Sequence, residues 1–149
     1  MTHPTATVAR QRAIREAHDV GIDDAYISNM VDRFYARVQA DGMLGPIFAQ
    51  RITDWPHHLE HMKTFWRSIM LKTGEFSGNP MMKHAAIAKI DNPEFSHWLK
   101  LFAETLDELG GTQAARDRIY GRAEMIAESL LLGIHIHRDG VKFPAKMKG

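Results

Sequence analysis

The chain has 149 residues, a length typical of one domain, and it contains no cysteine. Disulfides, thiolate metal sites and cysteine nucleophiles are therefore excluded. Nineteen Lys and Arg against eighteen Asp and Glu give a net charge of +1, so we expect no nucleic-acid partner. No window has the ~18 continuous apolar residues of a membrane span, and the N-terminus does not resemble a signal peptide. We therefore expect no membrane partner and a cytoplasmic protein.

Hydrophobic periodicity predicts helices throughout the chain. A polar leader to about residue 7 precedes a short amphipathic helix at 8–20, which Gly21 stops. Asp23 is a good cap for the next helix. The apolar residues of that helix recur at helical spacing and place Tyr35 on the inward face. They are Ile27, Met30, Val31, Phe34, Tyr35 and Val38.

In the middle of the chain, the sequence pattern predicts a short helix, a long helix and a loop. The short helix covers Leu44–Arg51, and the long one covers about 54–72 with Pro56 in its first turn. Residues 74–80 are predicted to form a loop and 81–89 a short helical piece. The inward stripe of the long helix consists of Trp55, His58, Leu59, Met62, Trp66, Ile69 and Met70.

Two more helices complete the predicted fold. Asn92 is predicted to cap the first, which Gly110 ends, and Thr112 to cap the last and longest helix. A basic tail follows from Arg138. The inward residues of the first helix are Phe95, Trp98, Leu99, Phe102, Leu106 and Leu109. Long helices with short connectors leave a bundle, an α-helical interaction domain and a globin-like sandwich open.

Nine histidines in a short chain make a metal site the first hypothesis. His57 and His61 have the i, i+4 spacing of a zinc protease pair, but His58 stands where that motif has Glu. The pair also lies on a polar face, which favours two solvated side chains. A di-iron carboxylate site needs two Glu-x-x-His pairs, and Glu94 with His97 supplies one. Neither metal site is therefore favoured.

Four other side chains indicate a cofactor pocket. Tyr35, His58 and Trp98 lie on the apolar stripes of three different predicted helices, and His84 follows the predicted loop. Taken singly, Tyr35 and Trp98 are typical packing residues with one satisfied polar tip, and His84 is equally compatible with an exposed position. Together they describe an apolar slot with a metal ligand on one side and polar donors on the other. A haem with a bound diatomic gas requires such a slot.

Six segments resemble the group III truncated haemoglobins in order and spacing. They are RFYARV (33–38), LGPIF (44–48), DWPHHLEHMKTFW (54–66), GEFSGNPMMKH (74–84), FSHWLKLF (95–102) and RAEMIAESL (122–130). The resemblance covers about residues 26–134. It implies an all-α truncated globin, a two-over-two helical sandwich that holds a non-covalent haem b. Within one globin domain at 1–149, we expect an N-terminal extension at about 1–21, the globin core at 22–137 and the tail at 138–149.

The resemblance also implies roles for individual residues. His84 matches the proximal ligand of the haem iron. Tyr35, His58 and Trp98 match the distal cluster that contacts O₂, with His58 taken rather than His57 because His58 lies on the inward stripe. Further positions that line the haem are matched by Phe48, Met62, Trp66 and Phe102.

The functional expectation is a haem protein that reversibly binds O₂, NO or related diatomic ligands. No catalytic residue is assigned. Oxidation of NO or reduction of peroxide at the same haem would make the protein an enzyme, and an unidentified reductase would then restore ferrous iron. The alternative is a cofactor-free α-helical interaction domain, in which the aromatic and methionine stripes serve only as core.

Overall fold

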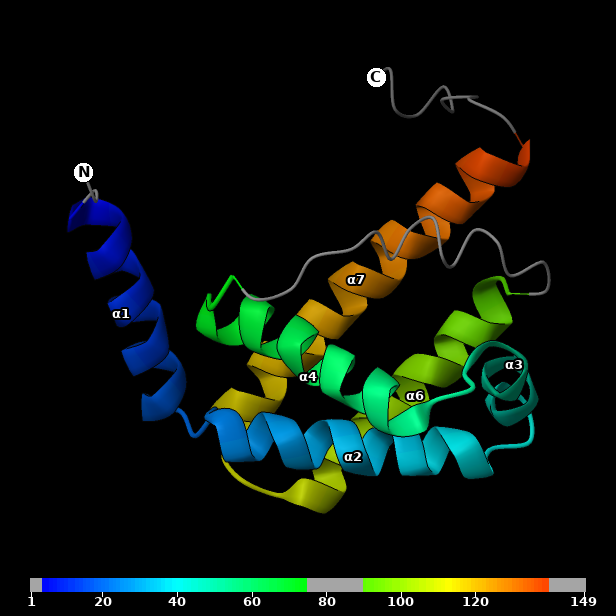
Figure 1. The fold of residues 1–149 in the computed structure, drawn as a ribbon, viewed down its shortest axis with the longest axis horizontal. Coiled ribbons are helices and arrows are strands. Elements are labelled where there is room, and N and C mark those ends of the chain that lie inside the picture. The colour runs from blue at the N-terminus through cyan, green and yellow to red at the C-terminus, as the bar shows by residue number, and fades with distance from the viewer. Residues whose placement is uncertain (1–3, 75–89, 140–149) are drawn as a thin grey trace.

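The computed structural model describes residues 4–74 and 90–139, and the secondary structure of these residues is helical. The helices are α1 (Pro4–Asp19), α2 (Asp24–Ala40), α3 (Leu44–Arg51), α4 (Trp55–Leu71), α6 (Asn92–Leu109) and α7 (Gln113–Asp139) (Figure 1). The predicted helical piece at 81–89, residues 75–80 of the predicted loop and residues 140–149 of the predicted tail lie outside the described residues.

Two antiparallel pairs of helices form the body of the protein. In Figure 1, α2 and α4 run side by side in opposite directions, and α6 and α7 cross behind them. The helix α2 is central, because it packs against α3, α4 and α6. The predicted two-over-two sandwich is therefore confirmed. No helix in the described part of the chain is both long and apolar enough to cross a lipid bilayer.

The core forms where the predicted apolar stripes of α2, α4 and α6 meet one another and α7. Phe34 on α2 and Phe102 on α6 are among its largest fully buried side chains. Tyr35, Trp66 and Met70 are buried in the same cluster, while Trp98 and Phe48 are half-buried at its edge. Burial of such large side chains contributes about 1.5–3 kcal/mol each to the stability of the folded state.

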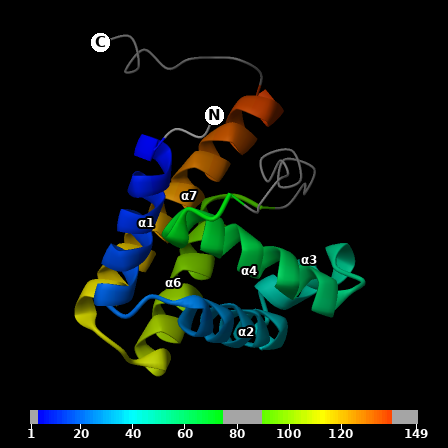
Figure 2. The same cartoon turned by 60° about the vertical axis from the view of Figure 1, so that its left-hand side comes forward.

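The helix α1 begins earlier than the sequence predicts, at Pro4 rather than near residue 8. Proline is tolerated in a first turn, where its missing N–H has no helical partner to lose. The C-terminal half of α1 packs on α4, and Ala17 is fully buried. In both Figure 1 and Figure 2 the N-terminal end of α1 and the C-terminal end of α7 point to the same side, away from α2.

The cap of α6 differs by one residue from the prediction, which placed it at Asn92. Asp91 is the cap, and its carboxylate accepts a hydrogen bond from the Asn92 N–H at 2.7 Å. The Glu94 side chain in turn accepts from the Asp91 N–H at 2.7 Å, which completes a capping box. Asp and Asn are equally good caps, so residue type alone did not distinguish them. At α7 the predicted cap is confirmed, because the Ala115 N–H donates to Thr112 Oγ1 at 3.0 Å.

Candidate functional site

Tyr35 lies at the centre of the candidate site. The stripe of α2 directs the ring inward, where it is 5% exposed, and its O–H donates to the sulfur of Met62 at 3.1 Å. Burial raises the pKa of the Tyr35 phenol well above its ordinary value. The hydroxyl therefore stays protonated and remains a donor. Because a thioether is a weak acceptor, the Tyr35 O–H would form a stronger hydrogen bond if a better acceptor came within its reach.

Three rings from α3 and the start of α4 surround Tyr35. The His58 ring meets it edge-on at 5.0 Å between centroids, and Phe48 lies at 5.9 Å. Trp55 lies 6.1 Å from Tyr35 and 5.5 Å from His58, and it stacks on Phe48. Sequence reasoning placed Trp55 on the inward stripe but did not assign it to the site. The sequence did contain a signal for this contact, since Trp55 and His58 are three residues apart and therefore share one helical face.

A second group of rings is formed by Trp66, Trp98 and Phe102. Phe102 stacks on Trp98 at 5.5 Å and on Trp66 at 5.3 Å. Phe34 connects this stack to the first group, because it lies 5.3 Å from Trp98 and 5.0 Å from Tyr35. Trp98 is therefore separated from Tyr35 by the width of one ring. The polar cluster expected from the sequence is split, with Tyr35 beside His58 and Trp98 behind Phe34.

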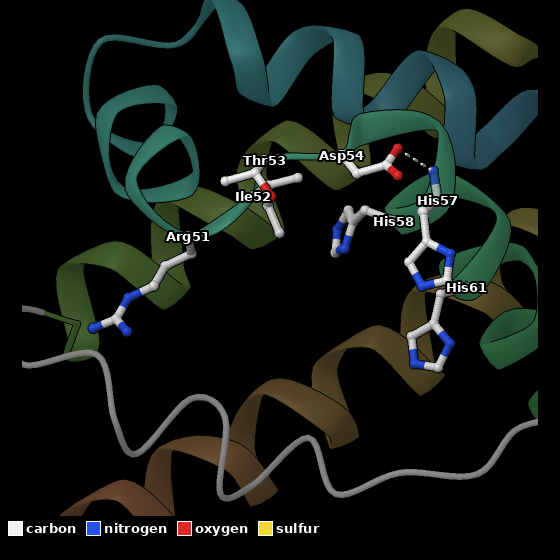
Figure 3. A pocket seen from close by; sticks show the side chains of 7 residues that line it. All are labelled: Arg51, Ile52, Thr53, Asp54, His57, His58 and His61. Atoms are coloured by element: carbon white, nitrogen blue, oxygen red, sulfur yellow. Dashed lines mark hydrogen bonds between the residues drawn. The ribbon is translucent and has the colours of Figure 1, made fainter.

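A pocket of about 250 Å³ opens where α3 ends and α4 begins, as Figure 3 shows. The ring of His58 points into it, and the Nε2 atom of this ring is shielded from solvent. The lining residues are Arg51, Ile52, Thr53, Asp54, His57, His58 and His61. Of these, only His58 was expected to line a pocket. Arg51 ends α3, and Ile52, Thr53 and Asp54 lie between helices and follow no periodic stripe.

The backbone around His58 is fixed by the start of α4. The Asp54 carboxylate accepts a hydrogen bond from the His57 N–H at 3.1 Å and so caps the helix. The His58 N–H donates to the Asp54 carbonyl at 3.0 Å. Since that amide already has a helical partner, the His58 side chain projects from regular helix.

The other histidine pair lines the mouth of the pocket. The rings of His57 and His61 are nearly parallel, with an angle of 9° and centroids 6.4 Å apart (Figure 3). His57 is exposed as predicted, whereas His61 is half-buried. Within the described ranges, no group of three or more His, Cys, Asp or Glu side chains is arranged to hold a metal ion. Neither a zinc protease site nor a di-iron site is therefore found there. His84, the predicted iron ligand, lies outside the described residues.

Comparison with known proteins agrees with this fold. A family model described as bacterial-like globin matches residues 18–131. The group 3 truncated hemoglobin ctb of Campylobacter jejuni is 33% identical over 110 residues, which are 71% of this chain and 86% of that protein. The crystal structure of a group III truncated hemoglobin from Campylobacter jejuni matches with a TM-score of 0.71 at 32% identity, over 76% of this chain and 91% of that one.

More distant relatives share the architecture. The group 2 truncated hemoglobin YjbI of Bacillus subtilis is 26% identical over 111 residues, 74% of this chain and 84% of that protein. A hemoglobin of Chloroflexus aurantiacus matches with a TM-score of 0.64 at 27% identity, over 77% of this chain and 95% of that one.

The fold and these matches define the class of protein, and the chain belongs to the bacterial-like globins. Within them it belongs to the group III truncated haemoglobins, as its sequence segments indicated. The matched region begins at residue 18, so most of α1 precedes it. The globins of this family bind haem. The ring cluster around Tyr35 fits that cofactor, since flat rings surround a buried phenol whose hydrogen bond ends on a weakly accepting sulfur.

Proposed function

We propose that the chain is a haem b protein that binds O₂ and related diatomic ligands, with Tyr35 as the main hydrogen-bond donor. The observation that carries this proposal is the buried Tyr35 O–H, which points at the Met62 sulfur among the rings of Phe48, Trp55 and His58. The haem iron, when bound, supplies the reversible coordination of the gas. The chain supplies apolar rings around Tyr35 and a buried donor that favours a ligand with a partial negative charge.

The haem is proposed to be held without covalent attachment. The chain has no cysteine to form the thioether links of c-type haem. His84 is the proposed proximal ligand, on the basis of its match to the family motif, and Phe48, Met62, Trp66, Trp98 and Phe102 are proposed to contact the haem. Replacing His84 with Gly should cause haem loss or an absorption spectrum that free imidazole restores. An unchanged spectrum and haem affinity would remove His84 from this role.

Tyr35 is proposed to anchor the ligand more strongly than His58. The phenol stays protonated, and an O–H donor makes a shorter bond to a partly anionic acceptor than a neutral imidazole does. His58 lies edge-on to Tyr35 and projects into the pocket, so we assign it to ligand entry and to the orientation of the phenol (Figure 3). Trp98, one ring further away, is assigned a weaker effect.

Absorption spectra and stopped-flow kinetics of the purified protein test the proposal. A strong haem band is expected, whereas a colourless folded protein that ignores added haemin would favour the cofactor-free interaction domain. Tyr35→Phe should raise the O₂ dissociation rate by about tenfold or more, since a charge-assisted hydrogen bond contributes about 1.5–3 kcal/mol. His58→Leu should change association more than dissociation, and Trp98→Phe should raise dissociation by less than Tyr35→Phe. The assignment is wrong if His58→Leu gives the largest increase in dissociation.

Redox chemistry at the same site is a second proposal. A ligand held by a strong donor dissociates slowly, which suits reaction better than delivery. The candidates are oxidation of NO by O₂ and reduction of peroxide, with a separate reductase that restores ferrous iron. Mixing the O₂-equilibrated protein with NO, and comparing that rate with spontaneous oxidation, tests the first candidate.

A further inference from the structure

Asp41 joins three helices at the end of α2. One carboxylate oxygen, Oδ2, accepts hydrogen bonds from the Met43 and Leu44 N–H groups at 3.0 and 2.9 Å, just where α3 begins. The other, Oδ1, lies 2.7 Å from Nε2 of His97 on α6. The Asp41 side chain is 15% exposed and that of His97 is 24% exposed. Water therefore screens this pair less than a surface ion pair.

The carboxylate of Asp41 is ionised in this setting. Burial raises its pKa, but the hydrogen bonds from His97 and from the Leu44 and Met43 amides outweigh that effect, and the pKa lies below its ordinary value. An ionised oxygen accepts stronger hydrogen bonds than a neutral one. The contact between α6 and the corner formed by α2 and α3 is accordingly a strong one.

The corner itself is closely packed on the α3 side. A Cβ atom on Gly45 would lie 2.9 Å from the carbonyl oxygen of Gln39 and 3.3 Å from that of Val38. The Gly45 N–H also donates to the Asp41 carbonyl at 2.9 Å. Since backbone meets backbone here, α3 has little freedom to move relative to Asp41. Phe48 lies one turn further along α3, where it contacts Tyr35.

On the α6 side, His97 directly precedes Trp98. Neighbouring side chains on a helix point about 100° apart, so His97 meets Asp41 while Trp98 meets Phe34 in the core. The position of the Trp98 ring therefore depends on how α6 is held at His97.

We propose that His97 is a positioning residue of the ring cluster around Tyr35. Through Asp41 it ties α6 to the corner of α2 and α3, and it thereby fixes the Trp98 and Phe48 rings on either side of Phe34 and Tyr35. The effect on ligand binding rests on the proposed function, whereas the effect on the rings is a property of the fold alone.

A second pair of the same chemistry provides a matched control. Nε2 of His135 on α7 lies 2.8 Å from Oδ1 of Asp91, the cap of α6. This pair also ties α6 to another helix, but it is more exposed, with 38% of the His135 side chain accessible. Asp91 lies at the start of α6, whereas His97 directly precedes Trp98.

The experiment compares His97→Leu, His97→Gln and His135→Leu in protein labelled with 5-fluorotryptophan. The Trp98 resonance is assigned by its loss in Trp98→Phe. His97→Leu should shift or broaden that ¹⁹F resonance and raise the O₂ dissociation rate by about threefold or more, a partial loss of one hydrogen bond. His97→Gln, whose amide N–H₂ can still donate to Asp41, should restore both values, and His135→Leu should change neither.

The proposal is overturned by an unmoved Trp98 resonance in His97→Leu, by an equal change in His135→Leu, or by a His97→Gln variant that behaves like the Leu variant. If far-UV circular dichroism shows that His97→Leu does not fold, His97→Gln is compared with the shorter His97→Asn. Only His97→Gln should then keep the wild-type Trp98 resonance and O₂ dissociation rate. Equal values in His97→Gln and His97→Asn would contradict the positioning role. The ¹⁹F readout does not need haem. A shifted resonance in a colourless protein refutes the proposed function alone, and an unmoved resonance in a haem protein refutes the positioning role alone.

Discussion

The two faces of α2 hold their polar groups in opposite ways. On the outer face, Arg33 and Arg37 bond the Glu108 carboxylate at 2.7 and 2.6 Å in contact with water. On the inner face, the Tyr35 hydroxyl is buried and reaches the Met62 sulfur. Exposed ion pairs add little net stability, because water solvates the separated charges almost as well. A buried donor with a weak partner gains more from a new acceptor, so the inner face is suited to ligand binding.

The largest expected difference between the two faces is in stability. Phe34→Ala should lower the free energy of unfolding by about 3–5 kcal/mol, because it removes a buried ring that contacts Tyr35, Trp98 and Phe102. The neighbouring Arg33→Ala should have a far smaller effect, since Arg33 is exposed. Urea unfolding of both variants measures the difference. Similar losses in the two variants would break the contrast between the faces.

Two glycines provide a similar contrast between a closely packed and an open position. Gly45 lies in α3 just after the end of α2, and Gly121 lies in α7. Gly45→Ala should destabilise the protein by about 1–3 kcal/mol, because its new methyl group would press on the Gln39 carbonyl. Gly121→Ala in α7 should stabilise by about 0.5–1 kcal/mol, since a Cβ there meets nothing outside its own helix backbone within 4 Å and alanine is the better helix former. Opposite shifts of the thermal midpoint are expected. Shifts of the same sign would show that the corner is not closely packed.

Met62 tests whether the weak acceptor matters for ligand binding. Met62→Leu keeps the volume, so it should cost less than about 1.5 kcal/mol of stability, but it removes the acceptor of the Tyr35 O–H. The freed donor should hold the ligand longer, and O₂ dissociation should slow by about twofold, the effect of a weak hydrogen bond. Flash photolysis or stopped-flow mixing measures this rate. Faster dissociation would mean that Met62 acts mainly by packing against the ligand site.

The smallest expected effects concern pH and salt. Hydrogen bonds from Arg33 and the charge of Arg37 lower the pKa of Glu108, and the bonds at Asp41 outweigh its burial and lower its pKa as well. A lowered pKa stabilises the folded state above the unfolded pKa of about 4, and this stabilisation is lost as the pH falls through the folded value.

The stability differences between wild type and Glu108→Gln or Asp41→Asn should therefore shrink as the pH falls from about 7 to 3. High salt should reduce the Glu108 difference more, because Asp41 is shielded. Thermal midpoints across pH at low and high salt measure both trends. Equal salt sensitivity of the two variants would contradict the shielding of Asp41.

Much of the fold was predictable because it is encoded locally. Helical periodicity depends on residues three and four positions apart, and it correctly placed Tyr35, Trp66 and Phe102 on inward faces. Capping depends on the few residues around a helix start, which is why Asp23 and Thr112 were identified. The same locality explains the error at α6, where Asp91 and Asn92 are chemically equivalent candidates and only the backbone distinguishes them.

The sequence by itself determined the helices, their inward stripes and, through its resemblance to known segments, the family. The tertiary structure alone decided which inward residues meet. The crossing of α2 and α6 places Phe34 between Tyr35 and Trp98, and it brings His97 to Asp41, 56 residues earlier in the chain. A stripe gives the direction of a side chain about its own helix axis. The angle and offset between two helices come from the packing of both surfaces. No pattern within a single helix could therefore indicate which residues of α2 and α6 meet.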